Sequence, residues 1–207
     1  MADINSKTAS AASNRTTSGS DRDRSDVQVL ASEYHPAPAG DLVKFVELLF
    51  FAYRDFTGDA DELLADLGYG RAHHRVIHFV ARHPGLRVAD LLDILRITKQ
   101  SLARVLKQLI DEGFVTQRSG ETDRRERLLY LTQKGRNFAE KLAELQCARV
   151  GKALEVVGAA GKDRVEEFLV EMISAQDRPA VAAILEKAAI NEYQQHESRR
   201  ANSGSDQ

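Results

Sequence analysis

The chain of 207 residues contains one cysteine and no tryptophan, and only 6% of its residues are aromatic. A single cysteine, Cys147, excludes an internal disulfide framework and is typical of a reducing compartment, which predicts a cytoplasmic location. No segment reaches the roughly 18 consecutive apolar residues of a membrane helix. The first residues do not combine a basic start with an apolar run, so we expect neither a secretory signal nor a membrane partner.

Recognisable catalytic motifs are also absent from the sequence. It has no glycine-rich phosphate loop, no nucleophile with evident His and Asp partners, and no paired carboxylates in a known motif. His74 and His78 are one helical turn apart, a spacing that can bind a metal, but no Cys or third His nearby completes the set. We therefore predict a protein that is not an enzyme and that carries no metal and no cofactor.

Both ends of the chain are polar and differ in composition from the middle. Residues 1–38 contain Ser-rich and Asp-Arg runs that cannot bury enough apolar surface to offset the entropy of ordering. Residues 194–207 are similarly polar. The sequence therefore predicts a disordered arm at 1–38, a folded domain at 39–193 and a disordered tail at 194–207.

Helical periodicity dominates the folded part. We expect a first helix at 41–57 that Gly58 and Asp59 interrupt, and a final helical region in which Pro179 marks an internal start. Two short strands, 114–118 and 127–132, flank a polar loop. The other predicted helices are 71–82, 87–95, 98–112 and a long one from 134 that Gly158 and Gly161 end. The fold class is therefore mainly α (α+β).

The net charge of −2 conceals a basic segment. Residues 71–136 contain 14 Lys and Arg against 7 Asp and Glu, a local +7, which leaves −9 for the rest of the chain. A locally basic face is what phosphate neutralisation requires. A solvated charged surface is the alternative interpretation.

The predicted helix 98–112 separates apolar from polar side chains. Leu102, Val105, Leu106, Leu109 and Ile110 share one face. The other face carries Gln100, Arg104 and Lys107, with Ser101 on its flank. Arg can pair with guanine and Gln with adenine, whereas Thr98 as N-cap, Lys99 and Ser101 suit phosphate oxygens near the helix start. An ordinary amphipathic helix would show the same separation.

The hairpin loop favours the nucleic-acid interpretation. Arg124 and Arg125 lie at its tip, where no core could use them, and where a basic finger could enter a minor groove. Asp123 fits an orienting partner for Arg125, and a turn-forming Asp is a compatible role.

The run from Asp123 to Gly135, with Asp-x-Arg followed by Leu-Thr-x-x-Gly, resembles the wing of the multiple antibiotic resistance regulator (MarR) family. The preceding segment from Thr98 to Val115 is similar to that family's recognition helix and its exit into the wing. The resemblance covers about residues 41–190. It implies a winged helix-turn-helix domain, about 71–136, flanked by dimerisation helices at 41–57 and 134–193. It further implies a homodimeric transcription regulator, usually a repressor, that binds a pseudo-palindromic operator on double-stranded DNA and is often released by a small ligand.

By this resemblance Gln100, Ser101, Arg104 and Lys107 would enter the major groove, and Arg124 and Arg125 the adjacent minor groove. His73 and Arg75 are further candidates for phosphate contacts. The long N-terminal arm and the region 162–193 depart from the family pattern. The details of the dimer are therefore expected to differ from those of the family.

Three alternatives remain open at this point. The winged helix could serve a protein partner instead of sequence-specific DNA, since fold does not fix function. Cys147 could act as a thiol-based redox sensor if its thiolate were exposed and of low pKa, or it could be a small buried or interface residue. The apolar residues between Phe45 and Tyr53 could line a ligand cavity, although helix packing in the core explains them more simply.

Overall fold

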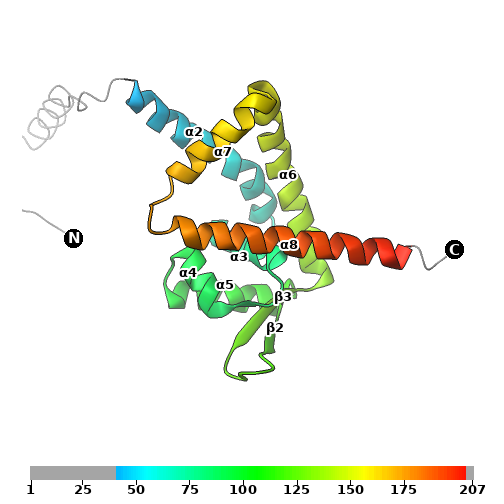
Figure 1. The fold of residues 1–207 in the computed structure, drawn as a ribbon. Helices are drawn as coiled ribbons and strands as arrows, with labels where there is room; N and C mark the ends of the chain where they lie inside the picture. Colours follow the sequence, from blue (N-terminus) through cyan, green and yellow to red (C-terminus); the bar gives the residue numbers. More distant parts are fainter. Residues whose placement is uncertain (1–40, 204–207) are drawn as a thin grey trace, which may run out of the picture. The chain divides into compact units, whose positions relative to one another are not determined.

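The structure is a computed structural model that describes the backbone of residues 41–203 and the side chains of residues 41–194. The predicted arm at 1–38 lies outside the described residues. The elements follow in the order α2 (Leu42–Ala65), α3 (Arg71–Arg82), β1 (Leu86–Arg87), α4 (Val88–Leu95), α5 (Lys99–Asp111), β2 (Val115–Ser119), β3 (Arg127–Leu131), α6 (Gln133–Val157), α7 (Ala159–Glu171) and α8 (Arg178–Ser203) (Figure 1). A mainly helical fold with a small antiparallel sheet confirms the predicted fold class.

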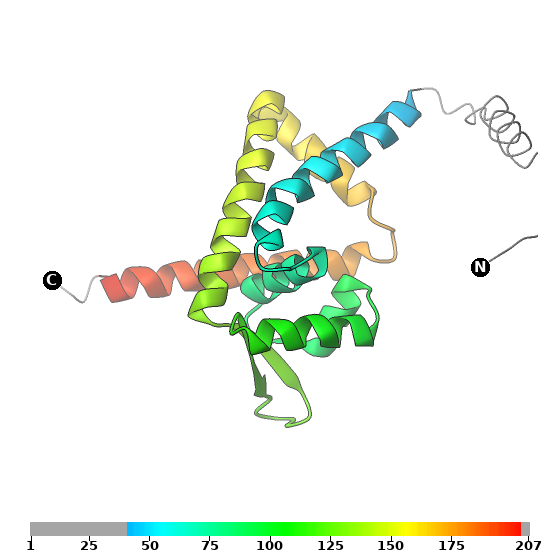
Figure 2. The same ribbon diagram turned by 180° about the vertical axis from the view of Figure 1, so that it is seen from behind.

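The sheet has three strands in the order β1-β3-β2. Strands β2 and β3 form the predicted hairpin, with Val115 opposite Leu131 and Ser119 opposite Arg127. Strand β1 is only two residues long and pairs Leu86 with Leu129. The hairpin projects from the helices α3, α4 and α5, as the views from both sides show (Figures 1 and 2). These three helices and the hairpin form a winged helix-turn-helix.

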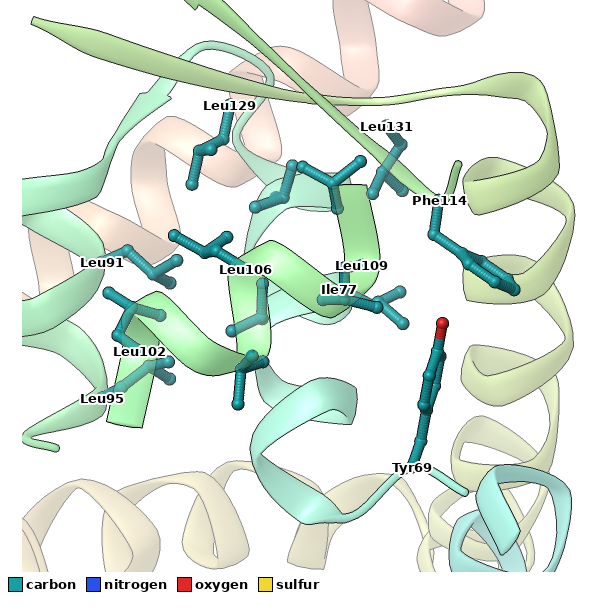
Figure 3. Close-up of a cluster of buried hydrophobic side chains, with 14 of the residues drawn as sticks. Tyr69, Ile77, Leu91, Leu95, Leu102, Leu106, Leu109, Phe114, Leu129 and Leu131 are labelled. Carbon is teal, nitrogen blue, oxygen red and sulfur yellow. The ribbon is translucent and has the colours of Figure 1, made fainter. Parts of the chain in front are cut away.

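The core lies inside this winged helix-turn-helix (Figure 3). Helix α5 buries Leu102, Leu106 and Leu109 on one face, in agreement with the predicted period. The largest other fully buried side chains are Leu64 from α2, Ile77 from α3, Leu91 from α4, Leu129 from β3 and Leu142 from α6. Because burial of each such side chain stabilises the fold by about 1.5–3 kcal/mol, this cluster fixes α5 on the rest of the domain.

The ends of some helices differ from those predicted. Helix α2 continues through Gly58 and Asp59 to Ala65, because Ala60 and Leu64 are buried in the core and Asp59 pairs with Arg149 of α6 at 2.7 and 2.8 Å. A glycine costs a helix only about 1 kcal/mol, which this packing exceeds. Gly158 separates α6 from α7, but Gly161 lies within α7.

Helix α8 begins at Arg178, so that Pro179 lies in its first turn as predicted. It then continues to Ser203, whereas a disordered tail was expected from residue 194. Extending an existing helix needs no new nucleus, so polar residues with adequate helix propensity can prolong it. Sequence periodicity could not detect this extension because these residues form no apolar stripe.

Candidate nucleic-acid interface

Helix α5 presents its polar face to solvent. Thr98 is its N-cap, and the Thr98 hydroxyl accepts a 3.1 Å hydrogen bond from the backbone N–H of Ser101. This cap starts the helix at the predicted residue and leaves the other N-terminal N–H groups available to an anion. Lys99, Gln100, Ser101, Arg104 and Lys107 are all exposed. The sequence therefore predicted this face correctly.

The cations on this face differ in their partners. Lys107 is paired with Asp111 one turn later, at 2.5 Å. Such an exposed pair contributes only about 0.3–0.5 kcal/mol, so a phosphate could replace Asp111 at little cost. Within the described part of the chain, the side chain of Arg104 makes neither a hydrogen bond nor an ion pair. Its five donors are therefore free to bind a ligand.

The tip of the β2–β3 hairpin is shaped by Asp123. Its carboxylate Oδ1 accepts a 2.8 Å hydrogen bond from the backbone N–H of Arg125. Asp123 therefore has the turn-forming role, the second of the two predicted roles, and its bond is to the backbone of Arg125 and not to the guanidinium. The side chains of Arg124 and Arg125 are exposed, and the described residues provide neither of them with a hydrogen-bond or ion-pair partner.

The loop end of the hairpin is braced by Arg87, a residue that no motif in the sequence singles out. Its guanidinium donates to Asp90 at 2.6 and 2.8 Å and to Glu126 at 3.1 Å. Arg127 donates to Ser119 across the hairpin at 3.0 Å. Arg87 and Asp90 are three positions apart, a spacing that could have indicated a pair. These contacts orient the hairpin relative to α4.

The Leu-Thr-x-x-Gly signature has a structural explanation. The Thr132 hydroxyl donates to the Gly113 carbonyl oxygen at 2.6 Å and accepts from the Gly135 N–H at 3.1 Å. Thr132 therefore caps α6 and also fixes the turn that follows α5. A Cβ at position 135 would collide with the Phe114 carbonyl oxygen, so only glycine permits this close approach.

His73 and Arg75 already have partners in the domain. The His73 ring accepts from the Gly70 N–H through Nδ1 and contacts Gln108 through Nε2, at 3.1 and 3.0 Å. Arg75 donates to the Leu95 carbonyl oxygen at the end of α4, at 3.2 Å. Both side chains therefore connect elements of the domain, and a phosphate contact by either would have to compete with these bonds.

A cavity of about 800 Å³ lies beside this domain. Its walls come from α3, α6 and β3, with Phe56 of α2 and Glu192 of α8. They include Ile77, His78, Leu142 and Leu154, and also Cys147, which is exposed. For the apolar residues between Phe45 and Tyr53, the sequence favoured core packing over a ligand cavity. Core packing within one chain is wrong for Phe50, Phe51 and Tyr53, which are 69%, 55% and 57% exposed.

Burial lowers the pKa of His78 at this cavity to about 4, and the nearby charges of His74, Arg82 and His83 lower it further. His74 is buried, which lowers its pKa, and it hydrogen-bonds Gln146. Within the described residues no group of three or more His, Cys, Asp or Glu could hold a metal ion. None of the described helices is long and apolar enough to cross a membrane.

Comparison with known proteins identifies the family of the chain. A family model described as MarR family matches residues 67–126. The chain is 45% identical over 153 residues to the HTH-type transcriptional regulator PetP of Rhodobacter capsulatus, and this match covers 74% of the chain and 85% of PetP.

Solved structures share the fold. A MarR-family regulator from Silicibacter pomeroyi has a TM-score of 0.57 at 19% identity, covering 67% of this chain and 94% of its own. NadR, solved in complex with 4-hydroxyphenylacetate, has a TM-score of 0.50 at 24% identity, covering 67% and 93%. The chain therefore belongs to the MarR family of winged helix-turn-helix transcription regulators, which are DNA-binding proteins and not enzymes.

Proposed function

We propose that the protein is a homodimeric repressor that binds a pseudo-palindromic operator and is released by a small ligand. Each subunit would place α5 in the major groove and the tip of its hairpin in the adjacent minor groove. The observation that carries this proposal is a set of three exposed arginines, Arg104, Arg124 and Arg125, that have no partner within the described residues. Since such a regulator acts on the chromosome, we place it in the cytoplasm.

The residues of α5 divide by what they can bind. Arg104 can donate two hydrogen bonds to guanine, and Gln100 can pair with adenine. Thr98, Lys99 and Ser101 surround the helix N-terminus, where the N–H groups and the helix dipole favour phosphate. Lys107 would exchange Asp111 for a phosphate oxygen. At the hairpin, Arg124 and Arg125 would enter a narrow minor groove, where the negative potential is strongest.

The homodimer is supported by apolar side chains that a single chain leaves in water. Phe50, Phe51 and Tyr53 of α2 and Phe168 and Leu169 of α7 are all exposed. Exposed aromatic and aliphatic clusters mark interaction sites. A second copy is the occupant we propose, because most soluble oligomers are symmetric and dimers are the commonest of them. Two-fold symmetry then requires two half-sites in inverted orientation.

The cavity of about 800 Å³ supports the proposed ligand response. Its size suits a small organic molecule, and its walls join α3, inside the DNA-binding domain, to α6. A ligand held there would shift the two helices relative to each other and would change DNA affinity only if it binds one arrangement more tightly. The NadR structure, which contains 4-hydroxyphenylacetate, suggests hydroxylated aromatic acids as the first compounds to test.

Three measurements test the proposal. Selection from a pool of random DNA duplexes should enrich an inverted repeat, and light scattering should give a mass near twice 23.0 kDa. Enrichment of no sequence, with binding limited to low salt, would favour a protein partner for this surface. For the ligand, thermal shift with a panel of hydroxylated aromatic acids should identify a stabiliser that also weakens binding to the selected duplex.

A further inference from the structure

Helix α5 is fixed near its C-terminal end by hydrogen bonds through four side chains, which we call the relay: Tyr69, His73, Gln108 and Glu112. The Gly70 N–H donates to His73 Nδ1 at 3.1 Å, and His73 Nε2 donates to Gln108 Oε1 at 3.0 Å. Gln108 Nε2 donates to Glu112 Oε1 at 3.0 Å. The Tyr69 hydroxyl donates to Glu112 Oε2 at 2.6 Å.

The donor and the acceptor of each hydrogen bond in the relay can be assigned in only one way. Because Nδ1 of His73 accepts from a backbone N–H, Nε2 must carry the proton of the neutral ring and can only donate. Gln108 must then present its oxygen to His73 and its NH₂ to Glu112. The relay ends on two carboxylate oxygens, which accept from both sides. The bond from Tyr69 holds the pKa of Glu112 below its ordinary value, which keeps this terminal acceptor ionised.

Tyr69 connects the relay to α2. Its backbone N–H donates to the Leu64 carbonyl oxygen in the last turn of α2, at 2.9 Å. Its ring is buried at the edge of the core beside Phe114 (Figure 3), and it stacks on His73 with the ring centres 4.6 Å apart. One residue therefore bonds the C-terminal end of α2 through its backbone and that of α5 through its side chain.

The remaining contacts of α5 leave its exact orientation less defined. Leu102, Leu106 and Leu109 hold the helix by apolar packing, which has little directional preference. Gln108 lies one helical turn after Arg104, so a shift of the helix at Gln108 also moves the Arg104 side chain. Hydrogen bonds to base edges depend strongly on distance and angle.

We propose that the relay positions the recognition helix relative to the end of α2, so that the side chains of α5 reach the bases of the operator at a fixed angle. The inference rests on the proposed function, in which α5 reads bases and α2 belongs to the dimer. Tyr69, His73, Gln108 and Glu112 are positioning residues in this account, and none of them needs to touch DNA.

Because each donor and acceptor is fixed, two single variants should each break the relay and their combination should restore it. In Glu112→Gln, one of the two carboxylate oxygens becomes an NH₂ group. That group then faces another donor, which is either the Gln108 amide or the Tyr69 hydroxyl. Gln108→Glu removes the donor to Glu112 and places two carboxylates together. The double variant Gln108→Glu with Glu112→Gln restores each bond. Its carboxylate at position 108 accepts from His73 and from the new amide at position 112, and the oxygen of that amide accepts from Tyr69. The double variant also keeps the net charge of the wild type.

The readout is the ratio of affinities for two duplexes: one that the wild type selects from random DNA, and the same duplex scrambled. We expect each single variant to lower this ratio about tenfold and the double variant to return within about threefold of the wild type. Tyr69→Phe keeps the ring and should lower the ratio about fivefold. Binding to the scrambled duplex reports the phosphate contacts and controls for the altered charge of the single variants.

Thermal unfolding confirms that each variant is folded at the assay temperature. The inference is overturned if the single variants keep the wild-type ratio, or if the double variant discriminates no better than the weaker single variant. A wild type that enriches no duplex overturns the proposed function and this inference with it. A wild type that enriches one, with variants that discriminate equally well, overturns this inference alone.

Discussion

Asp123 accepts a 2.8 Å hydrogen bond through Oδ1 from the backbone N–H of Arg125, and this bond shapes the tip of the hairpin. We expect Asp123→Ala to bind the selected duplex at least about threefold more weakly than Asp123→Asn, because Asn keeps the acceptor. Both variants lose the negative charge, so charge alone cannot separate them. Fluorescence anisotropy measures the difference. Equal affinities would show that the turn does not matter for binding.

Arg104 should determine one base position in each half-site. We expect Arg104→Ala to weaken binding to the selected duplex by about 1–3 kcal/mol for each half-site and to relax the preference at that position. Arg104→Lys keeps the charge but loses the planar fork, so it should lose the preference while retaining most of the salt dependence. Competition with duplexes substituted at each position measures both effects. An Arg104→Ala variant with unchanged preferences would remove α5 from base recognition.

The tip arginines should act on all sequences alike. We expect Arg124→Ala to weaken binding to the selected and scrambled duplexes by similar factors. The slope of log affinity against log salt should fall by about 2 for the dimer, about 1 for each hairpin. Arg164→Ala controls for the loss of one exposed positive charge, because Arg164 lies in α7, outside the basic segment, and is paired with Glu167. Light scattering must give this control the same mass as the wild type, since α7 belongs to the proposed dimer surface. If the two variants show the same slope, the hairpin does not contact the DNA backbone.

The free energy of unfolding should fall as the pH is lowered from about 6.5 towards 4. His78 has a folded-state pKa of about 4, whereas an unfolded His titrates near 6.5, so the unfolded chain takes up its proton first. The stabilisation from neutral His78 is complete above pH 6.5, and roughly 2–3 kcal/mol is lost by pH 4.

Urea unfolding at pH 7.5, 6.0 and 5.0, at constant protein concentration, measures this loss. The variant His78→Gln cannot titrate, so its stability should change less over this range. Burial also lowers the pKa of His74 and of His83. Both residues therefore add to the loss of stability at low pH, and their contribution remains in the variant. A variant with the same pH dependence as the wild type would contradict the assignment to His78.

The sequence predicted the elements that rest on local patterns. The apolar period of α5, its Thr98 cap and Gly113 after its end all lie within the continuous segment 98–113, and the structure has all three. The hairpin is similarly local, because a polar loop separates two apolar strands. Local chemistry therefore identified the exposed face of α5 and the loop tip as candidate binding surfaces.

Contacts between distant residues could not be predicted in this way. Tyr69 and Glu112 are 43 residues apart, and no sequence motif links the two positions. Strand β1 has two residues, too few for a period, and exists because Leu86 and Arg87 pair with β3. His73 was a candidate for a phosphate contact in the sequence, but both of its ring nitrogens make hydrogen bonds inside the domain. The packing of the whole domain decides these positions.

We expect this chain to recognise DNA sequence through α5, as part of a symmetric dimer. Selection from random duplexes, carried out in parallel with the wild type and with Arg104→Ala, separates this recognition from sequence-independent binding. The wild type should enrich an inverted repeat, and Arg104→Ala should lose the preference at one base position in each half-site. Enrichment of no sequence by the wild type, or an identical enriched repeat with the variant, would contradict it.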